Sequence, residues 1–202
     1  MINIEISEEN LERTEKLLAG IPKGAERAFS NAINRGLSHL KTQAFKEVRE
    51  VYAVKLSDLN SATKVRVQKA GGQSPVGYIN FAGVKIPLYK FKASPSSPGS
   101  KQKVKAGVKI GGGATFENAF IARMMSGHLG VFERTGEQGI EKRLEKYKPN
   151  KYTEKVEEKM GLAAEQMIRN EDVLEKVSEE AQKKVNERLE HEIYRILNGY
   201  GG

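Results

Sequence analysis

The chain has 202 residues, of which 38% are hydrophobic and 30% charged, and it carries a formal net charge of +8. This length suffices for a domain with its own core, and the hydrophobic content is too high for a disordered chain. The absence of cysteine excludes disulfides and thiol chemistry. No apolar run is long enough to span a bilayer, and the acidic N-terminal stretch is unlike a signal peptide, so we expect no membrane contact.

The excess positive charge is confined to the middle of the chain. Residues 59–116 contain ten Lys or Arg and no Asp or Glu, which leaves 24 of the 34 basic residues and all 26 acidic residues elsewhere. A segment of one sign attracts an anionic partner, either nucleic acid or an acidic protein surface, and the simpler alternative is a solvated lysine-rich sheet face. The residues predicted to contact DNA or an acidic partner are Lys64, Arg66, Lys85, Lys90, Lys92, Lys101, Lys103, Lys105 and Lys109.

Two helices are predicted in the N-terminal part, residues 1–56. Ser7 and the acidic residues after it are typical of a helix start, and Gly20 and Pro22 end this first, short helix. Beyond Pro22, apolar residues recur every three or four positions as far as Val51, which predicts a helix of roughly 27 residues, about 40 Å long. A helix of this length with one apolar face packs across a sheet or against a neighbouring subunit.

The hydrophobic period changes to two over residues 62–136, which predicts a central antiparallel sheet of about five or six strands. The stretches TKVRVQKA, VGYINF, KIPLYKF and KVKAGVKIG are each typical of a strand, and Pro87 places the third at a sheet edge. Residues 93–103, rich in Ser and Pro, are predicted to form a basic loop. TFENAFIARMM pairs back on the preceding strand, and after the turn at Ser126-Gly127 the stretch HLGVFERTG forms the next strand.

A second long helix is predicted at the C-terminal end. Residues 140–169 are charged and show no clear period, which predicts an irregular connector. Asn170 is a favourable N-cap, and the apolar stripe after it predicts a helix over 170–199 with Gly199 in a left-handed stop. The expected fold is therefore a single α+β domain over residues 1–202, in which long helices flank the antiparallel sheet along the chain.

No catalytic, metal or cofactor site is predicted. HEIYR at His191 begins like a zinc-protease motif but has arginine where the second histidine is needed. The glycines at 111–113 lack the rest of a phosphate-binding loop and are better interpreted as a turn. Glu117 and Glu133 have nothing that makes them a catalytic pair, and His128 has no nucleophile signature beside it, so this histidine is interpreted as structural. We therefore expect a protein that is not an enzyme.

Four stretches carry a further signal through their order along the chain. They are GAERAFSNAINRGLSHLKTQAFKEV (24–48), with its Ala-Ile-Asn-Arg core, IPLYKF (86–91), NAFIARMMSGHLGVFERTG (118–136) and NEDVLEKVSEEAQKKVNERLEHEIYRILNG (170–199). In this order they resemble the minor tail protein Z family of lambda-like, long-tailed phages and prophages. Each stretch alone is a weak signal, whereas the ordered set covers most of the chain.

The resemblance implies a structural minor tail protein that acts in tail completion and head–tail joining, at the head-proximal end of a virion tail assembled in the host cytoplasm. Implied partners are other tail and neck proteins (tail terminator, tail tube, head-completion adaptor), further copies of the chain in a cyclic oligomer, and DNA in the tail channel. The alternative function is sequence-independent nucleic-acid binding, because no base-reading motif is present. The residues predicted at subunit interfaces are Phe29, Ile33, Phe120, Ile121, Val131, Phe132, Leu189 and Ile193.

Overall fold

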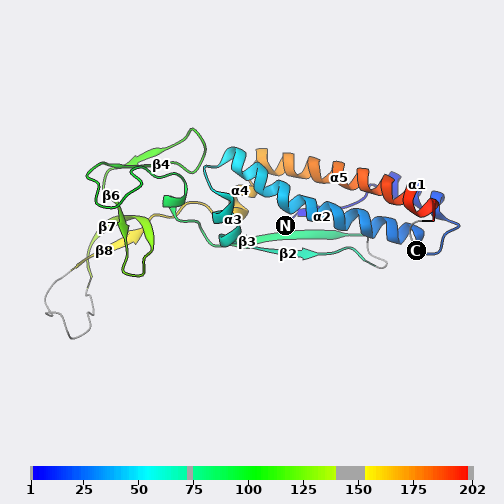
Figure 1. Cartoon of the computed structure of the whole chain (residues 1–202), viewed down its shortest axis with the longest axis horizontal. Coiled ribbons are helices and arrows are strands. Elements are labelled where there is room, and N and C mark those ends of the chain that lie inside the picture. Colours follow the sequence, from blue (N-terminus) through cyan, green and yellow to red (C-terminus); the bar gives the residue numbers. More distant parts are fainter. Residues whose placement is uncertain (1, 72–74, 140–152, 200–202) are drawn as a thin grey trace, which may run out of the picture. The chain divides into compact units, whose positions relative to one another are not determined.

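Helices and antiparallel strands make up the structure, a computed structural model that describes residues 2–71, 75–139 and 153–199 (Figure 1). The elements in chain order are β1 (Ile2–Ile4), α1 (Glu8–Leu18), α2 (Gly24–Val51), α3 (Leu56–Ala62), β2 (Thr63–Gln68), β3 (Gly77–Gly83), the 3-10 turn η1 (Leu88–Lys90), β4 (Val104–Ala106), β5 (Ala114–Phe116), β6 (Ala119–Arg123), β7 (Leu129–Gly139), β8 (Thr153–Glu158), α4 (Ala164–Ile168) and α5 (Glu171–Leu197). The α+β class and the long helix toward each end of the chain are confirmed.

The chain divides into two compact units, each built from segments that are distant in sequence. Unit 1 consists of residues 1–49, 63–84 and 164–202, and unit 2 of residues 50–62 and 85–163. Unit 1 contains the long helices and the sheet of order β1-β3-β2, whereas unit 2 contains the β4-β5 hairpin and the sheet of order β6-β7-β8.

In unit 1 the alternation along β3 turns its apolar residues toward α2. The rings of Phe81 and Phe45 are in contact, with 5.9 Å between their centroids. Gly77, at the start of β3, is so close to the helix that an added Cβ would lie 2.7 Å from side-chain atoms of both Ile33 and Leu37. The helix and the strand therefore pack directly on each other, and a larger residue than glycine at 77 would force them apart.

Strand β3, which α2 covers, pairs with both of its neighbours in antiparallel register. Val65 of β2 lies opposite Phe81, and Ile2 of β1 lies opposite Ile79. Figure 1 shows α2 and α5 side by side on the same side of β2 and β3. The apolar stripe predicted for α5 is buried at Val173, Val177, Ala181, Val185, Leu189, Ile193 and Ile196. Burial of this stripe, rather than helix propensity, accounts for most of the stability of so long a helix.

In unit 2 a small apolar cluster holds the hairpin against the second sheet. Val104 of β4 packs with Ala119 and Ile121 of β6 and with Val131 of β7. The turn predicted at Ser126-Gly127 is confirmed, because Gly127 has φ of 85° and β6 pairs antiparallel with β7 on either side of it.

The strands do not form one central sheet of five or six strands, and that prediction is wrong. They form sheets of three, two and three strands. The stretch KIPLYKF is not a strand: Pro87 has no N–H to donate, and the carbonyl of Pro87 instead accepts a hydrogen bond of 2.9 Å from the backbone N–H of Lys90, which closes η1. In unit 1 the third strand is supplied by β1, at the N-terminus, which the alternation in the central segment does not indicate.

The segment expected to be an irregular connector contains two regular elements, β8 and α4. β8 pairs with β7 in antiparallel register, with a shift between Arg134 and Gln138. Its sequence TEKVEE has no alternation of apolar and polar residues strong enough to predict a strand, so the pairing with β7 determines it. Residues 140–152 lie outside the described residues.

Candidate partner-binding surfaces

The first two residues of the predicted basic surface, Lys64 and Arg66, lie on β2 in unit 1. Both are exposed, and both alternate with Val65, whose cross-strand partner Phe81 contacts the helix. Because successive side chains of a strand point to opposite faces, Lys64 and Arg66 lie on the face of the sheet turned away from α2. The strand order makes β2 an edge of this sheet.

The other seven predicted residues lie in unit 2, and all seven are exposed. On β4 the alternation is as expected, with Val104 and Ala106 buried and Lys105 exposed. Lys105 also exchanges two backbone hydrogen bonds with Ser94, of 2.8 and 2.7 Å, which tie the loop 93–103 to β4. Strand β4 is therefore paired on both sides, with β5 and with Ser94, and Lys105 lies on its exposed face.

Two of these seven lysines are neutralised within the chain. Lys90 forms an ion pair of 3.0 Å with Asp58, and Lys103 forms an ion pair with Glu117. Among the described residues no carboxylate pairs with the remaining predicted contacts, which are Lys64, Arg66, Lys85, Lys92, Lys101, Lys105 and Lys109. The unpaired positive charge is thus divided between the units, with two residues in unit 1 and five in unit 2.

The predicted interface residues of the long helices are packed within unit 1. Phe29 and Ile33 of α2 are buried, and so are Leu189 and Ile193 of α5. Their apolar surface is already removed from water by the same chain, which accounts for the stripes without a second subunit. Their assignment to a subunit interface stays a prediction.

The predicted interface residues of unit 2 lie on two faces of the β6–β7 hairpin. Ile121 and Val131 are cross-strand partners in the buried cluster. Phe120 and Phe132 are partners on the opposite face, with ring centroids 6.3 Å apart. Phe120 is only half-buried, and the guanidinium carbon of Arg134 lies 5.4 Å from the centre of its ring. Phe120 is therefore the residue of this group with most apolar surface left for a partner.

His128, Glu117 and Glu133, three of the residues considered for catalysis, are each paired with another side chain. His128 Nε2 lies 2.7 Å from Glu158 Oε1, and the imidazole packs edge-on against Phe132. Glu117 is paired with Lys103, and Glu133 is paired with Lys159. The two glutamates thus have separate partners, and the histidine links β8 to the β6–β7 turn.

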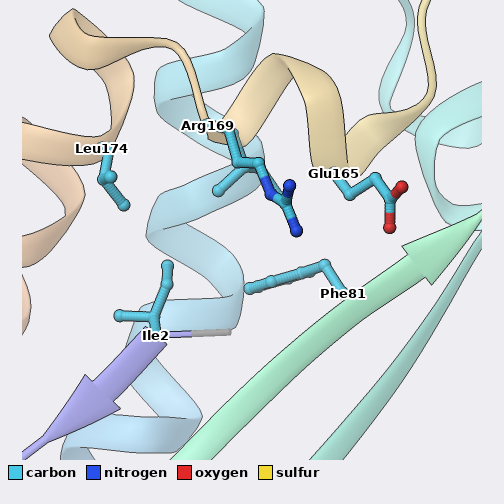
Figure 2. A pocket seen from close by; sticks show the side chains of 6 residues that line it. Ile2, Phe81, Glu165, Arg169 and Leu174 are labelled. Atoms are coloured by element: carbon cyan, nitrogen blue, oxygen red, sulfur yellow. The ribbon is translucent and has the colours of Figure 1, made fainter.

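A recess of about 300 Å³ in unit 1 has an apolar floor (Figure 2). Its lining consists of Ile2, Phe81, Glu165, Ile168, Arg169 and Leu174. Figure 2 shows Glu165 and Arg169 reaching over Phe81, with Ile2 and Leu174 on the opposite side. The lining includes no histidine, serine or second carboxylate beside Glu165, and four of its six residues are apolar, so the recess offers mainly packing surface.

A second cavity, between α2 and α5 of unit 1, was not predicted from the sequence. It is lined by polar residues from both helices together with Lys69, which follows β2. Two features of the sequence are consistent with this cavity but do not predict it. One is the Asn34-Arg35 pair within the Ala-Ile-Asn-Arg core, and the other is the spacing that places Arg188, Glu192 and Arg195 on one face of α5. Neither feature shows that the two helices lie side by side.

The pKa shifts of the described part concern two ion pairs, one between α1 and α5 and one within α5. Arg13 of α1 forms a two-pronged ion pair with Glu190, with Nη2–Oε2 at 3.0 Å, and this hydrogen bonding lowers the pKa of Glu190 and raises the pKa of Arg13. One turn earlier, a hydrogen bond from Lys184 lowers the pKa of Glu187. The first pair joins α1 to α5 and the second lies within α5, and because all four groups are paired they do not form a reactive cluster.

Within the three described ranges, no group of three or more His, Asp or Glu is gathered as a metal site would require. None of the helices in those ranges has the length and apolarity needed to cross a bilayer.

Residues 10–199 match the profile of the family described as prophage minor tail protein Z. The chain belongs to this family. No curated protein and no solved structure matches the chain significantly.

Membership of the minor tail protein Z family makes the protein a structural component of a phage tail. The matched region includes every helix and strand from α2 to α5, and therefore most of the core of each unit; β1 lies outside it. The stretch 118–136, on which the resemblance partly rests, forms the β6–β7 hairpin. The stretch 24–48 forms most of α2, whose Asn34 and Arg35 line the polar cavity.

Proposed function

We propose that the protein acts in tail completion and head–tail joining, at the head-proximal end of the tail. The observation that carries this proposal is the match to the minor tail protein Z family, because it extends over residues 10–199 and so includes both units. The role is structural: the protein binds neighbouring tail and neck proteins, and it also binds further copies of itself.

The edge strand β2 supports the subunit contact of a cyclic oligomer. Among the described strands β2 pairs only with β3, so its other edge presents unpaired backbone donors and acceptors. Val67 of β2 is 45% exposed, whereas its cross-strand partner Ile79 is fully buried. A strand added from a second copy would satisfy the backbone groups and cover Val67, and a head-to-tail contact of this kind closes into a ring.

The unpaired basic side chains support contact with an acidic surface of a neighbouring tail or neck protein. Five of them lie in unit 2, and no described carboxylate offsets their charge. In a ring each copy adds the same field, so the attraction for an acidic partner is multiplied. Protein rather than DNA is the favoured partner of this surface, because the chain has no base-reading motif.

The test is complementation of a phage or prophage that lacks this protein. Electron microscopy of the particles should show tails that do not join heads, and wild-type protein supplied in trans should restore joined particles. The double variant Lys101→Glu/Lys105→Glu should restore fewer, because it replaces two of the five unpaired positive charges of unit 2 with negative ones. The matched control is Lys41→Glu/Lys46→Glu, which changes two exposed lysines of α2 by the same charge. Normal joining and DNA delivery by tails that lack the protein would overturn the proposal.

Sequence-independent nucleic-acid binding is a second candidate, favoured by the acid-free segment 59–116. It predicts DNA affinity that falls steeply with salt, with a slope of log K against log salt of about −0.9 for each phosphate contacted. Size-exclusion chromatography and titration with duplex DNA separate the candidates. A monomer with such a salt dependence supports this second function, whereas a ring without DNA affinity excludes it.

A further inference from the structure

The polar cavity in unit 1 has a volume of about 360 Å³ and no apolar residue in its lining. The lining residues are Asn31, Asn34, Arg35, Ser38, Lys69, Arg188, His191, Glu192 and Arg195. The cavity lies where α2 and α5 run side by side in Figure 1, and a hydrogen bond of 3.1 Å from Asn31 Nδ2 to Glu192 joins the two helices there. A recess with only polar walls is hydrated when empty and suits a charged ligand.

Positive charge dominates this cavity. Four of its residues are cationic, Arg35, Lys69, Arg188 and Arg195, and Glu192 is the only acid, which leaves an excess of three positive charges when His191 is neutral. Arg35 and Lys69 are exposed, and no carboxylate among the described residues pairs with either. Like charges so gathered repel one another unless an anion lies between them.

Glu192 holds two of the guanidinium groups in place. Its side chain is only 4% exposed. It accepts a hydrogen bond from Arg188 Nη2, at 3.2 Å, and forms an ion pair with Arg195 Nη2, at 2.9 Å. Each arginine uses one end of its guanidinium for this contact and has further donors left. Glu192 therefore orients the two guanidiniums but neutralises only one of their charges.

The two arginines also carry unsatisfied donors. The Nε atoms of Arg188 and Arg195 are inaccessible to solvent, and neither has a hydrogen-bond partner within the described part of the chain. A buried donor without an acceptor is costly, and one explanation for such a group is a ligand that supplies the acceptor. Oxygen atoms of an anion in the cavity would supply acceptors to these groups once the two guanidiniums turn toward it.

The position of Lys69 at the cavity is fixed by its neighbour Ala70, whose backbone forms two hydrogen bonds with the side chain of Asn34. Asn34 Nδ2 donates to the carbonyl of Ala70, and the backbone N–H of Ala70 donates to Asn34 Oδ1, both at 3.0 Å. An asparagine that bonds both groups of one residue acts like a neighbouring strand. The segment after β2 is thereby fixed on α2 beside Arg35.

We propose that this cavity binds a phosphate group, either as the free ion or in the backbone of a nucleic acid. A carboxylate carries one negative charge and would leave most of the excess uncompensated, whereas phosphate carries about −2 and has oxygens for several donors. The guanidinium fork matches the geometry of phosphate oxygens in two-pronged hydrogen bonds. The inference concerns a site on α2 and α5 and does not rest on the role in tail completion.

The first test replaces the two exposed cations that take no part in holding Glu192. Isothermal titration calorimetry with inorganic phosphate, against chloride at equal ionic strength, should give millimolar affinity for the wild type. Arg35→Gln/Lys69→Gln should weaken it by about tenfold or more. Lys41→Gln/Lys46→Gln, with the same change of charge on exposed residues of α2 outside the cavity, should leave it unchanged.

The source of the phosphate is tested with a short DNA duplex in a fluorescence anisotropy titration. If the cavity variant weakens duplex binding and the control variant does not, nucleic acid is the source. If only inorganic phosphate depends on the cavity, the free ion is the ligand. Phosphate affinity and duplex affinity that are both insensitive to Arg35→Gln/Lys69→Gln overturn the proposal, as does tighter binding of a poly-glutamate peptide than of either.

Glu192→Gln tests the same site with a readout that a structural role alone would not produce. The substitution keeps the volume but removes the carboxylate that competes with a bound anion, so phosphate affinity should rise several-fold. The variant should also lose thermal stability in phosphate-free buffer, and added phosphate should restore it by more than it stabilises the wild type. Stability lost without recovery in phosphate would contradict the proposal.

Discussion

Gly36 of α2 and Val185 of α5 touch, because a Cβ atom added to Gly36 would lie 2.4 Å from Val185 Cγ2. That distance is well inside van der Waals contact, so the two helices approach as closely as they do only because residue 36 has no side chain. Asn31, five positions before Gly36 on α2, donates a hydrogen bond to Glu192, which lies seven positions after Val185 on α5. The two pairs show that the helices run antiparallel, and that the close approach at Gly36 lies beside the polar cavity.

Gly36→Ala is expected to destabilise unit 1. Alanine favours a helix over glycine by about 1 kcal/mol, but the clash is with a β-branched side chain that has little freedom to move. We expect a net loss of about 1–3 kcal/mol in the free energy of unfolding, measured by urea denaturation.

The control for this change is Gly20→Ala, because an added Cβ at Gly20 meets nothing within 4 Å. It should be close to neutral. The double variant Gly36→Ala/Val185→Ala should lose less stability than the sum of the two single variants, because Val185→Ala removes the methyl group with which the new Cβ clashes. A Gly36→Ala protein as stable as the wild type would show that the helices do not meet at this point.

Asn34→Ala is expected to release the segment after β2 from α2. It removes both hydrogen bonds to the backbone of Ala70, at a cost of about 1–3 kcal/mol. The direct readout is amide hydrogen exchange, which should become faster at Ala70.

Ser38→Ala is the matched control for Asn34, since its exposed hydroxyl bonds only to the Asn34 carbonyl. It should change stability by less than about 0.5 kcal/mol and leave exchange at Ala70 unaltered. Asn34→Asp keeps the acceptor for the Ala70 N–H and should preserve more protection than Asn34→Ala. Equal protection of Ala70 in wild type and Asn34→Ala would contradict the contact.

Arg13→Gln is expected to raise the pKa of Glu190 toward its ordinary value. In the wild type, hydrogen bonding from Arg13 is the main cause of the lowered pKa, and burial opposes it. A folded-state pKa below the unfolded value contributes stability above the unfolded pKa, and this contribution is lost as the pH falls through the folded pKa. The free energy of unfolding of Arg13→Gln should therefore fall less than that of the wild type as the pH is lowered through the acidic range.

The measurement for Glu190 is an NMR titration of the side-chain carboxyls. Glu187 provides an internal control, because its pKa is lowered by Lys184 and not by Arg13. It should titrate alike in both proteins. An unchanged titration of Glu190 in Arg13→Gln would mean that the ion pair does not form in solution.

Lys90→Gln is expected to destabilise unit 2, because Lys90 pairs with an Asp58 side chain that is only 14% exposed. The pair links η1 to α3. Because Lys90 itself is partly exposed, the loss should be at most about 1 kcal/mol and should shrink at high salt. Lys85→Gln removes the same charge from an exposed lysine with no described carboxylate partner, and equal effects of the two substitutions would argue against the pair.

The helices were predictable because their signals are local. The period of three to four residues in α2 and α5, the N-cap position of Asn170 and the left-handed Gly199 all agree with the structure. Even here one detail differs: the Asn170 side chain makes no capping hydrogen bond, and its Oδ1 has no partner within the described residues. Position and backbone geometry were predictable, whereas the side-chain contact was not.

The sheets were less predictable because a strand needs a partner from elsewhere in the chain. Alternation located β2 and β3 but gave no hint that β1 is their third strand. KIPLYKF has the composition of a strand, yet the proline and the turn at Leu88–Lys90 limit its pairing to one isolated bridge, between Pro87 and Met160. β8 has almost no apolar residues and is a strand only because β7 lies beside it.

By itself, the order of residues determined the two long helices, the acid-free segment and the likeness to a tail protein family, since periodicity, local charge and motif order are properties of neighbouring residues. The tertiary structure alone decided that Lys90 and Lys103 are neutralised, that the predicted interface residues of the helices are core, and that a cationic cavity lies between α2 and α5. Asn31 and Glu192 are 161 positions apart in sequence and within hydrogen-bond distance in the fold. Contacts of that kind depend on how the elements pack, which no local pattern specifies.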